Sequence, residues 1–192
     1  RRIAEGDDPV VAYTEQGRTM SATEVREWWR TARAALAVAA ADVDPKARIP
    51  WYGPPMSAMS FLTARLMECW AHGQDVRDAL GAPPEVSPRL RHVAHIGVGA
   101  RPFCFAIRGL EAPADPIDVV LTAPAGDIWT WGPGDAADRV EGTALDFCLL
   151  VTQRRHRADT ALAVTGPAAE AWISIAQAFA GAPGPGRAPL GG

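Results

Sequence analysis

The segment from residue 57 to residue 81 carries the longest helical pattern in the chain and constrains the fold most. Ser57 begins this pattern, and Gly81 ends it as a C-cap, since glycine readily adopts the left-handed conformation that follows a helix. Apolar or small residues recur along one stripe at spacings of four and three: Leu62, Leu66, Cys69, Gly73, Val76 and Leu80. This spacing suits the seam of a helical bundle. Met67 and Trp70 lie on another face, so we expect most of the helix to be buried.

Two further helices are predicted on either side of this segment. A capping box at Ser21–Glu24 begins the first, and apolar spacing continues it to about residue 43. A Ser-Pro pair begins the second, which covers residues 87–108 and contains Gly97 and Gly99. Both glycines should allow close contact between helices. Residues 1–20 are polar and weakly patterned, so we expect a loop or a poorly formed segment there.

The pattern changes after residue 110. Four segments have the alternation or the residue types of short strands: 117–123, 127–132, 138–141 and 161–165. Two more helices are predicted, over 143–151 and 167–179. The sequence therefore predicts an α+β protein with a helical domain over residues 1–110, a small α+β domain over 111–181 and a flexible Gly- and Pro-rich tail over 182–192.

Charge and composition exclude several classes of function. The 192 residues carry a formal net charge of −3, which gives no reason to expect a nucleic-acid partner. No apolar run approaches the ~20 residues of a membrane span, and the charged start is unlike a signal peptide. The three cysteines form no CxxC pair, so we expect buried, reduced thiols in a cytoplasmic protein with no membrane partner. No P-loop, GxGxxG, nucleophile elbow or HExxH motif is present.

Three polar residues share one side of the predicted helix over 57–81. Relative to Glu68, His72 is turned by about 40° and Asp75 by about −20°, at about 100° per residue, so all three lie on one narrow stripe. A carboxylate and an imidazole one turn apart suit a divalent metal, with Asp75 as a further ligand or as the acceptor of the second N–H of His72. Spacing alone favours an ordinary hydrogen-bonded stripe, because a zinc site needs at least three protein ligands.

Aromatic and basic residues outside this helix are candidates for binding a substrate or a thiol. Trp51 and Tyr52 stand in a Pro-rich connector, where they pack on the helical core or line a pocket. Arg154 and Arg155 follow the predicted helix over 143–151. There they either favour the helix C-terminus or bind a carboxylate, for which arginine offers bidentate geometry.

The stretch GPPMSAMSFLTARLMECWAHGQDVRDALG resembles the metal-binding helix of the mycothiol-dependent maleylpyruvate isomerase family, within the DinB-like metalloprotein superfamily. Together with LRHVAHIGV and LDFCLLVTQRRHR, it is similar to an actinobacterial branch of metal-binding proteins. The resemblance spans roughly residues 20–182, and its core, E-x-W-x-H-G-x-D, is fairly specific. It favours the metal interpretation of the Glu-His-Asp stripe.

This resemblance implies a DinB-like helical bundle that holds a divalent metal, usually zinc, followed by a small sterol-carrier-like α+β domain. Glu68 and His72 match the family's ligands, and the third is a His from an earlier helix. This sequence has no His before His72 and begins with Arg1 rather than Met. We therefore expect the first helix of the bundle to precede residue 1; a truncated member with an impaired metal site is the alternative. The substitutes within this chain are His92, His95 and His156, although the family places no ligand there.

The family's chemistry uses a low-molecular-weight thiol. The metal lowers the pKa of that thiol, and the thiolate adds to an activated double bond or displaces a leaving group. The resulting hypothesis is a metal-dependent isomerase or thiol S-transferase that acts on a small electrophilic metabolite, with mycothiol as cosubstrate. The alternatives are a thiol-independent isomerase or cyclase of secondary metabolism and a non-catalytic small-molecule or lipid-binding protein. A homodimer remains open.

Overall fold

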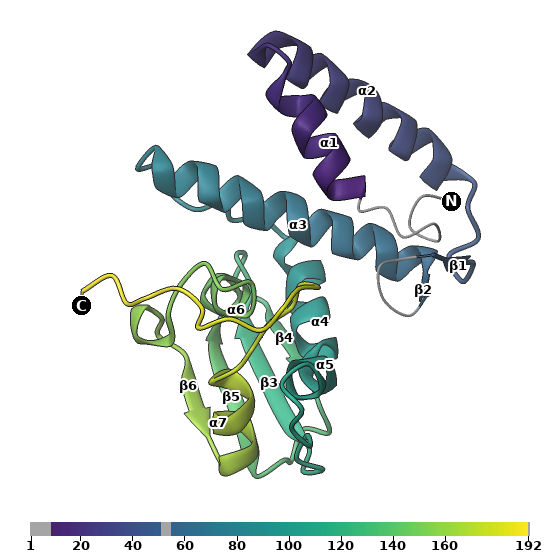
Figure 1. Cartoon of the computed structure of the whole chain (residues 1–192). Helices are drawn as coiled ribbons and strands as arrows, with labels where there is room; N and C mark the ends of the chain where they lie inside the picture. Colours follow the sequence, from purple (N-terminus) through teal and green to yellow (C-terminus); the bar gives the residue numbers. More distant parts are fainter. Residues whose placement is uncertain (1–8, 51–54, 192) are drawn as a thin grey trace. The chain divides into compact units, whose positions relative to one another are not determined.

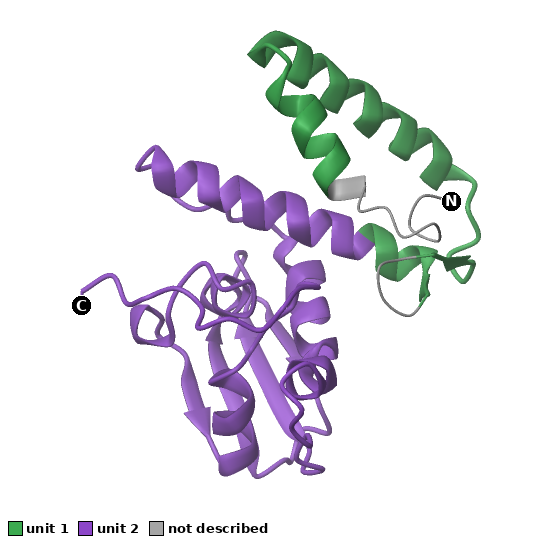
Figure 2. Cartoon of the chain, viewed as in Figure 1, with its two compact units in different colours: residues 1–62 green, residues 63–192 purple. Residues whose placement is uncertain are grey.

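The structure is a computed structural model that describes residues 9–50 and 55–191. It divides into two compact units, Arg1–Leu62 and Thr63–Gly192 (Figures 1 and 2). The domain boundary predicted near residue 110 therefore falls inside the second unit. Trp51 and Tyr52, the predicted aromatic pocket residues, lie outside the described residues.

The described part of the first unit contains helices α1 and α2, a short hairpin and the start of helix α3. Helix α1 spans Pro9–Arg18 and α2 spans Ala22–Ala41. Strands β1 (Arg48–Ile49) and β2 (Met56–Ser57) pair antiparallel before α3 begins. The predicted capping box is present, because the Ser21 hydroxyl accepts from the Glu24 N–H while the Glu24 carboxylate accepts from the Ser21 N–H.

Helix α1 corrects the loop predicted over residues 1–20. Pro9 is its first residue, where the missing N–H costs no helical hydrogen bond. The ring of Tyr13 lies 5.9 Å from the ring of Trp28 on α2. This contact joins two segments that are separate in the sequence. Local periodicity does not detect such support, so the prediction of a loop was wrong for residues 9–18.

Helix α3 spans Ala58–Ala79 and confirms the long predicted helix. Its buried face differs from the predicted seam, since Cys69, Val76 and Leu80 are exposed. In the second unit the buried side chains of α3 are Met67, Trp70, Ala71 and Gln74. The large Trp70 ring decides this orientation: it joins the core that includes Leu90, and its Nε1–H donates to the Glu85 carbonyl at 3.0 Å.

A four-stranded sheet forms the centre of the second unit. Its strands are β3 (Ile117–Thr122), β4 (Ile128–Trp131), β5 (Asp138–Thr143) and β6 (Ala163–Thr165), in the order β4-β3-β5-β6. β3 runs parallel to β5, and the other neighbouring pairs are antiparallel. Val119 and Val140 are register partners and are both buried. The predicted hairpin and the α+β class are thus confirmed.

Helices α6 (Ala144–Val151) and α7 (Pro167–Ile173) pack on this sheet. The rings of Phe147 and Trp172 meet edge to face, with centroids 6.0 Å apart, and both side chains are buried. α7 ends at Ile173, earlier than predicted. The reason is that the following chain turns away, and the Ala178 N–H donates to the Val151 carbonyl at 2.7 Å.

The helix predicted over 87–108 is divided into α4 (Leu90–Gly99) and α5 (Arg101–Ala106). The break at Ala100 precedes Pro102, which lacks the N–H that a continuous helix would need. α4 packs against α6, and a β-carbon at Gly97 would lie 2.7 Å from Cγ2 of Val151. The close helix contact expected at Gly97 is therefore confirmed. Gly99 has no such neighbour within 4 Å.

The segment after residue 180 has no helix or strand in its described part, yet it contacts other parts of the second unit. The Leu190 N–H donates to both carboxylate oxygens of Asp159 at 3.1 Å, and Arg187 forms ion pairs with α3. Among the described residues, no helix is long and apolar enough to cross a membrane.

Candidate functional site

Helix α3 brings Glu68, His72 and Asp75 together, as the helical spacing predicts. His72 Nε2 lies 3.5 Å from Glu68 Oε2, and His72 Nδ1 lies 3.2 Å from Asp75 Oδ2. The His72 side chain is 70% exposed, whereas that of Glu68 is 24% exposed. The imidazole therefore faces one carboxylate with each ring nitrogen and remains accessible from solvent.

The two nitrogens of His72 are not equivalent in this arrangement. A neutral imidazole carries one N–H. When this hydrogen is on Nδ1, it donates to Asp75, and Nε2 presents a lone pair toward the Glu68 carboxylate. Two acceptor atoms then face each other 3.5 Å apart, and a proton or a metal cation would satisfy both. Ligand atoms about 2.0–2.1 Å from a tetrahedral zinc lie about 3.3 Å apart, which is close to this separation.

Asp75 is held by an arginine from the segment that follows α6. Arg154 donates from Nε to Asp75 Oδ1 at 3.1 Å and from Nη2 to Oδ2 at 2.7 Å, a bidentate pair. Partial burial by itself would raise the pKa of Asp75, but the hydrogen bonds and charge of Arg154, with a smaller effect of His72, hold this pKa below its usual value. Asp75 is therefore a fixed anion beside His72.

Asp78, one turn further along α3, anchors a second bidentate pair. Arg155 donates to both of its carboxylate oxygens at 2.8 Å. Arg187 from the C-terminal segment donates to Oδ2 at 2.7 Å, and Gln74 donates to Oδ1 at 2.7 Å. The hydrogen bond from Arg155 lowers the pKa of Asp78 most. Burial opposes it, and the bonds from Gln74 and Arg187 add to the lowering. These contacts attach α3 to the end of α6 and to the C-terminal segment.

These ion pairs bear on the predicted metal site. Glu68 and His72 offer two donor atoms at a suitable separation, while both oxygens of Asp75 are hydrogen-bonded to arginine. Within residues 9–50 and 55–191, no group of three His, Cys, Asp or Glu side chains is placed to hold a metal ion. The described residues by themselves therefore do not complete a zinc site, and the metal-ligand role of Glu68 and His72 stays a prediction.

The other histidines lie on other elements than α3. His95 Nδ1 accepts from the indole N–H of Trp131 at 3.3 Å. His156 Nδ1 accepts from the Ala158 N–H and caps the short helix η2 (Arg157–Asp159). His92 is exposed on α4.

The predicted carboxylate-binding role of Arg154 and Arg155 is not tested by this structure. Their carboxylate partners here are Asp75 and Asp78 of α3. The sequence segment RRHR (residues 154–157) left a role at the helix C-terminus and a role in carboxylate binding both open. It did not indicate these partners within the protein, because the pairing joins residues about 80 positions apart.

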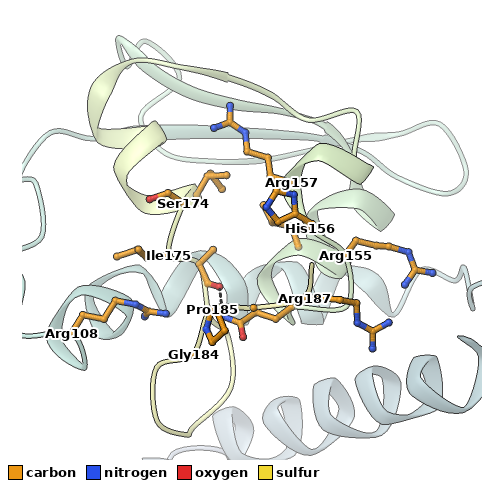
Figure 3. Close-up of a pocket in the computed structure, with 14 residues that line it drawn as sticks. Arg108, Arg155, His156, Arg157, Ser174, Ile175, Gly184, Pro185 and Arg187 are labelled. Atoms are coloured by element: carbon orange, nitrogen blue, oxygen red, sulfur yellow. Dashed lines mark hydrogen bonds between the residues drawn. The ribbon is translucent and has the colours of Figure 1, made fainter. Parts of the chain in front are cut away.

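A pocket of about 240 Å³ lies beside these ion pairs and has no counterpart in the sequence motifs (Figure 3). Its basic lining residues come from three separate segments: Arg108, Arg155, His156, Arg157 and Arg187. Leu150, Ile173 and Ile175 contribute apolar walls. Arg108 and Arg187 were missed because neither stands in a recognisable motif. Only the fold brings them to the same pocket as the RRHR segment.

The fold and the site together define an α+β protein in which helix α3 carries a carboxylate–imidazole stripe with an exposed His72. Residues 2–77 match the family model of the mycothiol maleylpyruvate isomerase N-terminal domain, so this segment of the chain is similar to that domain. Residues 113–165 match a model described as wyosine base formation. The predicted likeness of the small domain to sterol carrier proteins stays a prediction.

The chain is also similar to two curated proteins. Both are proteins of Mycobacterium tuberculosis described as uncharacterized, one from strain CDC 1551 / Oshkosh and one from strain ATCC 25618 / H37Rv. Each is 49% identical to this chain over 168 residues, which cover 88% of this chain and 65% of the relative. The chain thus spans slightly less than two thirds of their length. No solved structure matches it significantly.

Proposed function

We propose that this protein is an enzyme of the maleylpyruvate isomerase or thiol S-transferase type, which uses mycothiol to act on a small electrophilic metabolite. One observation carries the proposal. The segment that matches the mycothiol maleylpyruvate isomerase N-terminal domain ends in α3, and there the exposed His72 is held between Glu68 and Asp75. An exposed imidazole with an anchored carboxylate on Nδ1 has its Nε2 atom available for a ligand.

In this proposal Asp75 is a positioning residue. Its carboxylate is fixed by Arg154 and lies 3.2 Å from His72 Nδ1. In the tautomer with the hydrogen on Nδ1, Asp75 accepts that N–H and Nε2 carries the lone pair. Glu68 and His72 would hold a divalent metal, with a third donor from outside the described residues. When bound, such a metal would lower the pKa of a coordinated thiol. Trp51 and Tyr52 stay predicted contacts of the substrate.

Metal content tests the metal part of the proposal. We expect purified wild-type protein to contain close to one zinc or other divalent ion per chain. Inductively coupled plasma mass spectrometry measures this metal content. His72→Ala should lose most of that metal, because one of the two donors on α3 is removed. The matched control is His92→Ala, another exposed histidine, which should keep it. A wild-type protein without stoichiometric metal, or equal metal in both variants, would contradict this part.

Thiol chemistry is tested separately. Incubation with mycothiol and a small enone or maleyl-type acid should give a thiol adduct or a cis–trans isomerised product, detected by mass spectrometry or absorbance. Glu68→Gln should remove this activity while the protein stays folded. If metal binds but neither adduct nor isomerisation occurs with mycothiol, the thiol mechanism fails. A thiol-independent isomerase or cyclase then becomes the better assignment.

A second candidate function is non-catalytic binding of a small molecule. It is favoured by the fact that the described residues supply only two donors of a metal site, and by the pocket of about 240 Å³ in the second unit. It predicts that the affinity for the ligand is the same in the wild type and in Glu68→Gln, and that chelators do not change it.

A further inference from the structure

The arginines that line the pocket in the second unit differ in their partners. Arg155 and Arg187 pair with Asp78, and Arg157 pairs with Glu170. Arg108 instead donates to two neutral oxygens, the Cys104 carbonyl at 3.0 Å and Gln177 Oε1 at 3.5 Å. Among the lining arginines in the described part of the chain, Arg108 alone has no carboxylate partner.

The surroundings of Arg108 make this unbalanced charge relevant to ligand binding. The guanidinium is half-buried, and Figure 3 shows it directed toward the Gly184–Pro185 segment across the pocket. No Asp or Glu is among the described residues that line the pocket. The carboxylate of Asp159 is used by the Leu190 N–H and lies outside the lining. A partly desolvated guanidinium without an anion is costly, and a bound carboxylate would offset that cost.

The other residues that line the pocket indicate which chemical group the ligand carries beside its carboxylate. Leu150, Ile173 and Ile175 line the pocket with aliphatic carbon, and Pro185 adds another apolar surface from the C-terminal segment. The volume of about 240 Å³ is below the usual range for drug-sized ligands, so the occupant is small. The flat guanidinium matches a planar carboxylate in two-point geometry.

We propose that this pocket binds a small aliphatic monocarboxylate, with its anionic group on Arg108 and its hydrocarbon part against Ile173 and Ile175. The site is separate from the Glu68–His72 pair on α3, and its occupation does not depend on the proposed thiol chemistry. Its success or failure is therefore read independently of the function proposed above.

Titration by nuclear magnetic resonance tests the site on the whole chain. Butyrate is the probe, and butyramide is its uncharged match. We expect butyrate to shift the Arg108 Nε–Hε signal in a saturable manner and to give intermolecular Overhauser effects to the Ile173 and Ile175 methyl groups. Butyramide should bind about tenfold more weakly or not at all, because it lacks the charge.

Two variants separate a role of Arg108 in binding from a role in folding. Arg108→Gln should weaken butyrate binding about tenfold or more, and Arg108→Lys should weaken it less, since charge remains but the planar fork is lost. Arg139→Gln is the matched control, because Arg139 pairs with Glu141 and does not line the pocket. The Arg139→Gln variant should bind butyrate with the same affinity as the wild type.

Several outcomes would overturn the proposal. One is the absence of saturable butyrate shifts at Arg108 in the wild-type protein. Another is an absence of Overhauser effects between butyrate and the methyl groups of Ile173 and Ile175. This measurement uses the wild-type protein, so it tests the proposal even if Arg108→Gln does not fold. Inorganic phosphate binding as tightly as butyrate would show an anion site without an aliphatic component. Equal butyrate affinity in wild type and a folded Arg108→Gln would place the ligand elsewhere.

Discussion

The guanidinium of Arg154 donates hydrogen bonds to both carboxylate oxygens of Asp75, with an Nε–Oδ1 distance of 3.1 Å and an Nη2–Oδ2 distance of 2.7 Å. The same carboxylate lies 3.2 Å from Nδ1 of His72. Arg154, which follows the end of α6, therefore sets the environment of His72 on α3. This pairing keeps Asp75 charged and attaches α3 to the rest of the second unit.

Removing the charge of Asp75 should weaken this attachment. Asp75→Asn loses the bidentate pair, and we expect about 1 kcal/mol less free energy of unfolding, since Asp75 is 37% exposed and solvent screens the pair. Urea denaturation at neutral pH measures the change. The control is Glu141→Gln, which breaks an exposed pair with Arg139 on one strand and should change the stability little. Equal effects in the two variants would show that the Arg154 contact adds nothing.

The ion pairs of α3 should make the protein sensitive to acid. Asp75 and Asp78 both have pKa values lowered below their ordinary 3.8 in the folded state. Below that pH the unfolded chain binds more protons than the folded one, so the stability rises with pH there and is lost as the pH falls. Urea midpoints measured from pH 6 down to pH 2 should fall steeply below about 3.8 in the wild type. The fall should be shallower in Asp78→Asn; parallel curves would contradict the assignment.

The contact between α4 and α6 should tolerate no side chain at Gly97. Gly97→Ala would put its β-carbon 2.7 Å from Cγ2 of Val151 and 3.1 Å from Cε1 of Phe147. We expect a loss of about 1–3 kcal/mol in the free energy of unfolding, because both neighbours are buried and must shift. Gly99→Ala on the same helix meets nothing within 4 Å and should be neutral or stabilising by up to about 1 kcal/mol. Thermal unfolding of the two variants distinguishes the sites.

Gln153 follows α6 in a left-handed conformation, with φ of 58°, where glycine is usual. Its side chain compensates, since Nε2 donates to the Ala176 carbonyl at 3.2 Å. Gln153→Ala should therefore destabilise the protein by about 1 kcal/mol through the lost hydrogen bond. Gln153→Gly loses the same bond but relieves the backbone, so it should be about 1 kcal/mol more stable than the Ala variant. An Ala variant at least as stable as the Gly variant would contradict this account of the turn.

Much of the local structure could be predicted from the sequence. The 57–81 pattern located α3, the capping box located the start of α2, and the alternation after residue 116 located β3 and β4. Helix α1 was missed because its support is a ring contact between Tyr13 and Trp28. The exposed Cys69 shows the same limit, since periodicity names the apolar stripes of a helix but not which one meets the core.

The candidate site divides in the same way. Helical geometry alone places Glu68, His72 and Asp75 on one stripe, because positions four and three apart on a helix share a face. The sequence left open whether Asp75 is a further metal ligand or the acceptor of the second N–H of His72, and both roles stay predictions. The pairing of Arg154 with both oxygens of Asp75 is a result of tertiary folding that no local pattern predicted. The pocket around Arg108 is likewise tertiary, since it needs four separate segments to meet. Short-range spacing follows from covalent geometry, whereas charge pairing across the fold depends on packing that no local pattern encodes.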